Sequence, residues 1–160
     1  MVKVKKIRIL LAGGGTAGHI FPLITVGQEL SHLLATEGME SDIRYFGNAG
    51  PYGHMFEEEG IRVVAIPASK LRRYMDPRNL LEPFKFALGF FKSLWLLFWF
   101  MPHVCFSKGG PGALSVVLAA RFYFIPIVVH ESDAIPGLTN LITGRHARMV
   151  ELAFAAARSY

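Results

Sequence analysis

Apolar runs and helical periodicities alternate along this chain. The segment from Ile7 to Ala12 is an apolar run with the length and β-branched content of a buried strand, and from Ile20 to Leu34 apolar residues recur at helical spacing. Similar patterns predict further strands over 42–46, 61–66, 103–106, 125–129 and 149–154, and helices over 52–59, 84–101, 113–123 and 136–146. Strands that alternate with helices predict an α/β fold, in which a parallel sheet carries helices on both faces.

Three unusual turns follow strands of this predicted sheet. The first, from Gly13 to His19, contains four glycines, and the second, from Ser107 to Gly112, contains three. The third, from His130 to Asn140, has two acidic residues among its first four positions. Ligands of parallel sheets bind at the edge where the carboxyl ends of the strands lie. We therefore expect the three turns to converge on one site.

The first turn has the features of an anion site, most naturally for phosphate. Glycine lets a ligand approach the backbone closely, and the first N–H groups of the following helix are unpaired at the positive end of its dipole. Two glycine turns can hold two phosphates, and Lys108 can neutralise one of them. The sequence thus favours a phosphorylated ligand.

Two familiar uses of a glycine turn do not fit. The turn matches the dinucleotide pattern G-x-G-x-x-G, but the second strand ends in Tyr45-Phe46-Gly47-Asn48, without the acidic residue that binds the ribose. A P-loop has Lys and then Ser or Thr after its last glycine, where this chain has His19-Ile20. These residues argue against a nucleotide-binding oxidoreductase domain.

His19 is the distinctive residue of the first turn. A neutral imidazole beside an anion site can accept a proton from a hydroxyl group, which suits a general base. The alternative is that His19 only hydrogen-bonds the turn. Glu131 and Asp133 are open to two interpretations as well, because each could accept a proton or bind a hydroxyl, or could simply cap a helix or form an ion pair.

Composition and charge narrow the partners. Hydrophobic residues make up 52% of the 160 residues, and 17 Lys and Arg against 12 Asp and Glu give a net charge of +5. This balance favours phosphates, anionic lipid or another polyanion. Cys105 is the single cysteine, so neither a disulfide framework nor a cysteine metal cluster is expected. The apolar run after Lys6 is too short for a signal peptide and is predicted to be the first strand.

The most apolar stretch, 84–101, raises the question of a membrane. It has about the minimum length of a span, roughly 17 residues, but four small or charged residues fall on one helical stripe: Lys85, Gly89, Lys92 and Ser93. We expect an amphipathic helix with this stripe toward water and most of its apolar surface packed on the sheet. Its surplus aromatic residues follow a basic loop containing Lys70, Arg72, Arg73 and Arg78, which predicts peripheral contact with an anionic membrane.

Three motifs occur in the order of a known family. They are Gly14-Gly15-Thr16-Ala17-Gly18-His19 with Phe21-Pro22, then Ser107-Lys108-Gly109-Gly110, then His130-Glu131-Ser132-Asp133 with Pro136-Gly137-Leu138-Thr139-Asn140. Over nearly its whole length the chain resembles the N-terminal domain of the MurG family, glycosyltransferase family 28. The resemblance implies half of a GT-B fold, in which two Rossmann-like domains face a cleft. The chain departs from common family residues at Ala17, Pro111 and Asp133.

The resemblance also implies a reaction. The family transfers N-acetylglucosamine from UDP-GlcNAc to undecaprenyl-pyrophosphoryl-MurNAc-pentapeptide (lipid I) in peptidoglycan synthesis, with inversion and with no metal or other cofactor. His19 would be the catalytic base. The acceptor diphosphate would be bound by Gly14, Gly15, Thr16, Ala17, Gly18, Ser107, Lys108, Gly109 and Gly110. The acceptor or the cleft would be contacted by His130, Glu131, Ser132, Asp133 and Asn140.

In this interpretation residues 1–160 are an acceptor-binding domain, and the C-terminal donor-binding domain is absent. The fragment alone is expected to be inactive. Its expected place is the cytoplasmic face of the bacterial cell membrane, bound peripherally, without a nucleic-acid partner. The alternative is a non-catalytic membrane-anchoring subunit that recruits a separate donor-binding chain.

Overall fold

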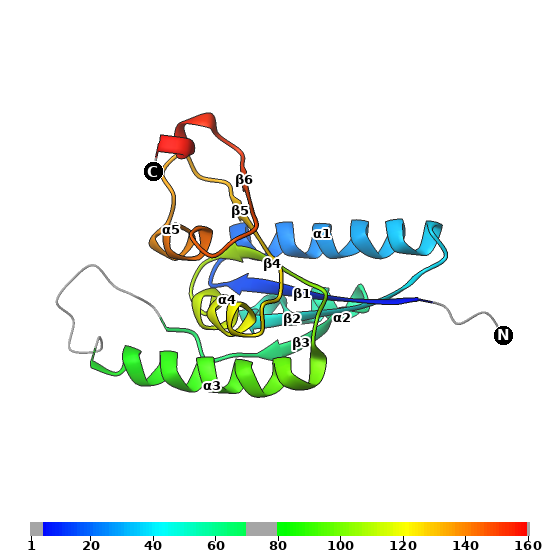
Figure 1. Ribbon diagram of the computed structural model, residues 1–160, viewed down its shortest axis with the longest axis horizontal. Helices are drawn as coiled ribbons and strands as arrows, with labels where there is room; N and C mark the ends of the chain where they lie inside the picture. The colour runs from blue at the N-terminus through cyan, green and yellow to red at the C-terminus, as the bar shows by residue number, and fades with distance from the viewer. Residues whose placement is uncertain (1–4, 70–79, 160) are drawn as a thin grey trace.

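The computed structural model describes residues 5–69 and 80–159, and it has the predicted α/β fold (Figure 1). Six strands form one sheet, and every pair of neighbouring strands is parallel. The strands are β1 (Lys6–Gly14), β2 (Glu40–Asn48), β3 (Arg62–Ala65), β4 (Val104–Gly109), β5 (Ile127–Glu131) and β6 (Met149–Leu152). The helices are α1 (Ala17–Thr36), α2 (Gly53–Glu58), α3 (Glu82–Phe100), α4 (Ala113–Phe122) and α5 (Leu138–Gly144), with short 3-10 turns at Gly50–Tyr52 and Ala155–Ser159.

Two apolar layers hold the sheet. On one face, α1 and α2 pack their apolar residues against the strand residues that point to this side of the sheet, such as Leu11 of β1 and Tyr45 of β2. On the other face, α4 packs against Leu10 and Phe46 of the same strands and against Cys105 of β4. Both faces of the central strands are therefore buried, which explains why β1 is apolar throughout its buried part, from Ile9 to Ala12.

The strand order places the site. The sheet runs β3-β2-β1-β4-β5-β6, so the direction of winding reverses between β1 and β4. In open parallel sheets a crevice forms outside the carboxyl ends of the strands at this reversal, because the following helices lie on opposite faces. The first glycine turn follows β1 and the second follows β4, so both lie at the crevice.

Helix α3 corrects one prediction from the sequence. Of the stripe that we expected to face water, Lys85 and Lys92 are exposed, but Gly89 and Ser93 are buried together with Leu97 and Phe100. The large apolar residues, which we expected to pack on the sheet, are mostly exposed instead. They are Phe84, Leu88, Phe91, Trp95, Phe98 and Trp99.

Small side chains explain this orientation. A side chain at Gly89 would come within 2.8 Å of the carbonyl oxygen of Pro67 and 3.1 Å of the Ser115 hydroxyl of α4. Ser93 is accommodated because its hydroxyl donates to the carbonyl of Gly89, 2.7 Å away in the same helix. The narrow stripe thus lets α3 lie close beside α4, while Leu97 and Phe100 at its C-terminal end pack against the sheet near Phe46.

The two lysines of the predicted stripe turn back to the protein. Lys85 pairs with the Glu82 carboxylate at 3.1 Å, and the Lys92 ammonium donates to the carbonyl of Ala65 at 2.8 Å. No helix among the described residues has the length and hydropathy of a membrane span. The predicted basic residues Lys70, Arg72, Arg73 and Arg78 lie outside the described residues.

Candidate functional site

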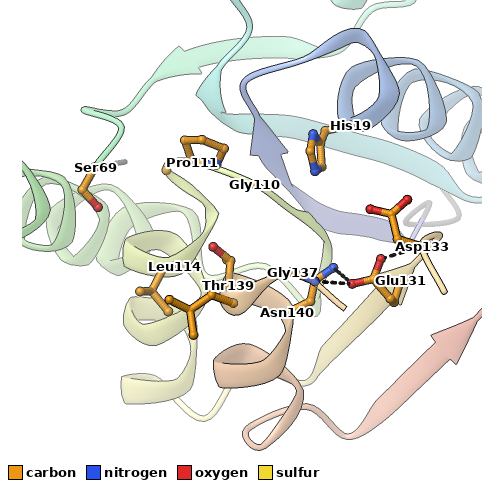
Figure 2. A pocket seen from close by; sticks show the side chains of 12 residues that line it. His19, Ser69, Gly110, Pro111, Leu114, Glu131, Asp133, Gly137, Thr139 and Asn140 are labelled. Carbon is orange, nitrogen blue, oxygen red and sulfur yellow. Dashed lines mark hydrogen bonds between the residues drawn. The ribbon is translucent and has the colours of Figure 1, made fainter. Parts of the chain in front are cut away.

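The three turns converge as predicted on one open pocket of about 340 Å³ (Figure 2). His19 from α1, the turn before α4 and the segment between β5 and α5 surround it. Its lining residues are His19, Ser69, Gly110, Pro111, Gly112, Leu114, Glu131, Asp133, Gly137, Leu138, Thr139 and Asn140.

The first turn is fixed from beneath by a residue that the sequence did not single out. The buried hydroxyl of Tyr45, on β2, donates to the carbonyl of Gly13 at 2.8 Å. This bond satisfies a carbonyl at the end of β1, where the chain leaves the sheet and enters the turn. α1 begins at Ala17, three residues after β1 ends at Gly14. The first turn of α1 contains no acidic side chain, so the helix itself does not neutralise the positive end of its dipole.

His19 lies in that first turn of α1 and faces the pocket (Figure 2). Its Nδ1 is 2.8 Å from the Thr16 hydroxyl. Burial of the ring and, next, the positive charge of Lys108 lower the pKa of His19 below its ordinary value, against the opposing effect of Asp133 and Glu131. The imidazole is therefore neutral at physiological pH, which is the form that accepts a proton.

Lys108 owes its position to an irregularity in the sheet. Ser107 pairs with Ala12 but Gly109 pairs with Gly13, so Lys108 is the extra residue of a β-bulge. Bulges change the direction of a side chain and are frequent beside functional sites. The Lys108 side chain is only 2% exposed, and its ammonium donates to the Ser132 hydroxyl at 2.7 Å. It lies behind the pocket wall, from where its charge acts on the site.

The two glycine turns interlock. Gly110 contacts the first turn so closely that an added side chain would collide with the carbonyl oxygen of Gly14 and approach the His19 ring to 3.2 Å. Gly15 in turn faces the ring of Pro111, which would lie 2.9 Å from a side chain at position 15. Each turn therefore fixes the other, and together they hold the imidazole.

Glu131 organises the third turn. Its carboxylate accepts hydrogen bonds from the backbone of Asp133 at 2.9 Å and of Gly137 at 3.2 Å, and from the Asn140 amide at 3.0 Å (Figure 2). Burial by itself raises the pKa of Glu131, but these three bonds and the charge of Lys108 hold the pKa below its usual value. Glu131 is thus an ionised structural anchor whose oxygens are occupied by its own turn.

Asn140 connects the third turn with the second turn. Its side-chain oxygen lies against Gly109, where any side chain would collide with it. Ser107 supports the same turn by accepting the N–H of Gly109 at 3.2 Å. The second and third turns therefore pack closely at Asn140, as the first and second do at Gly110.

The predicted site residues divide into two groups. His19, Gly110, Glu131, Asp133 and Asn140 line the pocket. The others lie in or behind the turns: Gly14, Gly15, Thr16, Ala17, Gly18, Ser107, Lys108, Gly109, His130 and Ser132. His130 is half-buried and stacks on Phe106, with 6.3 Å between the ring centroids.

Sequence reasoning missed Ser69 and Leu114 in the pocket wall. Leu114 belongs to the first turn of α4, whose apolar pattern gave no sign of a site. Ser69 follows β3, so the rule that ligands bind at the carboxyl edge could have indicated it.

The arrangement can bind an anion and accept a proton. The start of α1 and the buried Lys108 bring positive charge to a crevice that Glu131 and Asp133 also line, and His19 offers a base at its wall. Across residues 5–69 and 80–159, no group of three or more His, Cys, Asp or Glu side chains could hold a metal ion.

Known proteins are similar to this chain in sequence and in fold. Residues 9–151 match the family model described as glycosyltransferase family 28 N-terminal domain. The UDP-N-acetylglucosamine--N-acetylmuramyl-(pentapeptide) pyrophosphoryl-undecaprenol N-acetylglucosamine transferase of Clostridium kluyveri is 38% identical over 92% of this chain and 40% of its own length. The transferase of the same name from Legionella pneumophila is 39% identical over 95% of this chain and 40% of its own length.

A solved structure agrees with these relatives. The crystal structure of MurG from Acinetobacter baumannii superposes with a TM-score of 0.73 at 25% identity, covering 94% of this chain and 42% of that protein. The chain thus spans about two fifths of the length of the proteins that it matches.

Proposed function

The chain belongs to the glycosyltransferase family 28 N-terminal domain family, and from this membership we propose that it is the acceptor-binding half of an inverting glycosyltransferase. The sugar would pass from UDP-GlcNAc to the lipid-linked diphosphate acceptor, lipid I. The observation that carries the proposal is the position of His19 at the wall of a crevice formed by two glycine turns. The relatives named above transfer N-acetylglucosamine to an acceptor of this kind.

The diphosphate of the acceptor would bind at the start of α1 and along the turn before α4. Unpaired helix N–H groups can donate to its oxygens, and Lys108 supplies a positive charge from behind the wall. Because Lys108 is buried and bonded to Ser132, it would stabilise the anion through space. The acceptor sugar would then lie toward His19 and Asp133.

His19 would act on the sugar hydroxyl. As that oxygen forms a bond to the anomeric carbon of the donor sugar, the bond from this carbon to UDP breaks, and His19 takes the hydroxyl proton. The product is the glycosylated lipid, with UDP as the leaving group. A base positioned in this way contributes typically 10²–10⁴-fold to the rate.

The test is sugar transfer with and without a donor-binding half. The purified chain should show a cooperative thermal melt but no transfer from UDP-GlcNAc to lipid I, since the family binds the donor on another domain. A chimera that continues this chain with the C-terminal half of the C. kluyveri relative should transfer the sugar. Turnover by the chain alone would contradict the division of labour, and a folded chimera that binds UDP-GlcNAc without transferring it would contradict the acceptor role.

We also propose that α3 attaches the domain to the membrane. Phe84, Leu88, Phe91, Trp95 and Trp99 are each at least 65% exposed along one helix, a larger apolar surface than a solvent-facing helix normally carries. A helix lying in the plane of the bilayer buries such a face among the acyl chains and keeps its other side on the protein. This face also favours the second candidate, a membrane anchor for a separate catalytic chain.

Membrane attachment should be lost when this face is made polar. Burying one large apolar side chain is worth about 1.5–3 kcal/mol, so Trp95→Ser should weaken binding to vesicles of phosphatidylglycerol and phosphatidylcholine about tenfold or more. Sedimentation with the vesicles at low and high salt measures the binding. High salt should weaken it, because it screens the attraction between the anionic lipid and a chain of net charge +5. Leu33→Ser, an exposed apolar residue of α1, is the control and should bind as the wild type does. Equal binding by Trp95→Ser and the wild type would exclude this face.

A further inference from the structure

Thr16 stands at the helix N-cap without capping the helix. Threonine at this position normally accepts a backbone N–H of the first turn through its hydroxyl. Here no such bond is formed, and the nearest partner of the hydroxyl is Nδ1 of His19, 2.8 Å away. The first turn instead closes through the backbone, since the N–H groups of His19 and Ile20 both point to the carbonyl of Thr16. The Thr16 hydroxyl is therefore committed to the imidazole.

The direction of this bond determines what His19 can do. A neutral imidazole has one N–H and one lone pair. If the hydroxyl donates to Nδ1, the proton is on Nε2, and the nitrogen left for a pocket ligand cannot accept a proton. If Nδ1–H donates to the hydroxyl oxygen, the Nε2 lone pair is free. The hydrogen bond made by one ring nitrogen sets the state of the other.

We propose that Thr16 is a positioning residue whose hydroxyl oxygen accepts Nδ1–H of His19 and so leaves the Nε2 lone pair free for the acceptor hydroxyl. The proposal rests on the function proposed for His19. It assigns to Thr16 a role different from contact with the diphosphate. Thr16 is exposed, so its own hydroxyl hydrogen can still be donated to water.

The other groups around His19 restrict the position of the ring, but none of them determines which ring nitrogen carries the proton. On the side of the second turn, the ring lies against Gly110, which offers no side-chain hydrogen bond. The charged groups that act on it are Lys108 from β4, and Asp133 and Glu131 from the segment after β5. Thr16 is the one described side chain recorded within hydrogen-bond distance of the imidazole.

The tautomer can be measured on the chain as it exists. Long-range ¹H–¹⁵N spectra distinguish a protonated from an unprotonated ring nitrogen, and the His19 signals are assigned by their loss in His19→Gln. We expect the Nδ1–H tautomer to predominate in the wild type and in Thr16→Ser, which keeps the hydroxyl. In Thr16→Val, which is nearly isosteric but cannot accept the bond, the ratio of tautomers should move several-fold toward Nε2–H. A wild type that is mainly Nε2–H, or a ratio unchanged in Thr16→Val, would overturn the proposal.

Kinetics in the chimera separate positioning from a merely structural role. Thr16→Val should lower kcat about tenfold or more with little change in the KM for UDP-GlcNAc, and Thr16→Ser should restore most of it. Equal rates for the wild type and a folded Thr16→Val would contradict positioning. If the wild-type chimera transfers no sugar while the tautomers behave as expected, the proposed function fails and the placement of the proton by Thr16 stands.

Discussion

Replacing His19 with alanine is expected to lower the kcat of the chimera by on the order of 10²–10⁴, with little change in the KM for UDP-GlcNAc. The reason is that a general base acts in the transition state, whereas the donor is bound elsewhere. Steady-state kinetics with lipid I and UDP-GlcNAc measure both quantities. If the loss is about tenfold and follows a fall in melting temperature, His19 serves only to hold the turn through Thr16.

The pH dependence of kcat/KM is a second test of whether His19 is the base. A base works only when deprotonated, so activity should fall as pH drops through the pKa of His19. Because burial and Lys108 lower that pKa, the fall should come at a lower pH than for an ordinary histidine. His19→Ala should lack this part of the profile. An unchanged acidic limb in the variant would assign the titration to another group.

The structure also selects between the other two candidate bases. Glu131 is 3% exposed, and its oxygens already accept three hydrogen bonds within its own turn. Asp133 is exposed at the pocket wall. If His19 proves structural, Asp133→Asn is therefore the informative variant, whereas Glu131→Gln is expected to act through disorder of the turn that it anchors.

The convergence of the three turns could be predicted from the sequence because it depends on local signals alone. Glycines mark where β1 and β4 end, and parallel strands bring their carboxyl ends to one edge. Lys108 shows where such signals stop. Its residue type predicted a charge at the site, but its burial behind the wall follows from a bulge between β1 and β4, which is a property of the pairing of two strands distant in sequence.

The orientation of α3 could not be predicted for a related reason. Its pattern identifies two faces, one with small and charged residues and one with aromatic residues, and hydrophobicity assigns the aromatic face to the core. Tertiary contact decides differently, because α3 packs closely against α4 at Gly89 and Ser93, and only Leu97 and Phe100 among its large apolar residues are fully buried. Close packing by small residues decided which face is buried, and that depends on the partner surface and not on the helix alone.

The interlock of the two glycine turns predicts that position 110 tolerates no side chain. In Gly110→Ala the new methyl group meets the carbonyl oxygen of Gly14, a backbone atom held in the sheet by the neighbouring Tyr45 bond to Gly13. A non-glycine residue at its φ of +83° costs about 1–2 kcal/mol, and the forced displacement adds about 1–3 kcal/mol. Urea unfolding should show a loss of about 2–5 kcal/mol.

Gly60→Ala separates the two contributions. Gly60 has a similar φ of +70°, but nothing lies within 4 Å of an added methyl group. This control should therefore lose only the conformational cost, about 1–2 kcal/mol, and keep the His19 spectrum of the wild type. Gly110→Ala should lose more and also shift the His19 signals, because the ring rests against that position. Equal losses in the two variants, with the His19 signals unchanged, would mean that the turns move apart freely and that the second turn does not hold the imidazole.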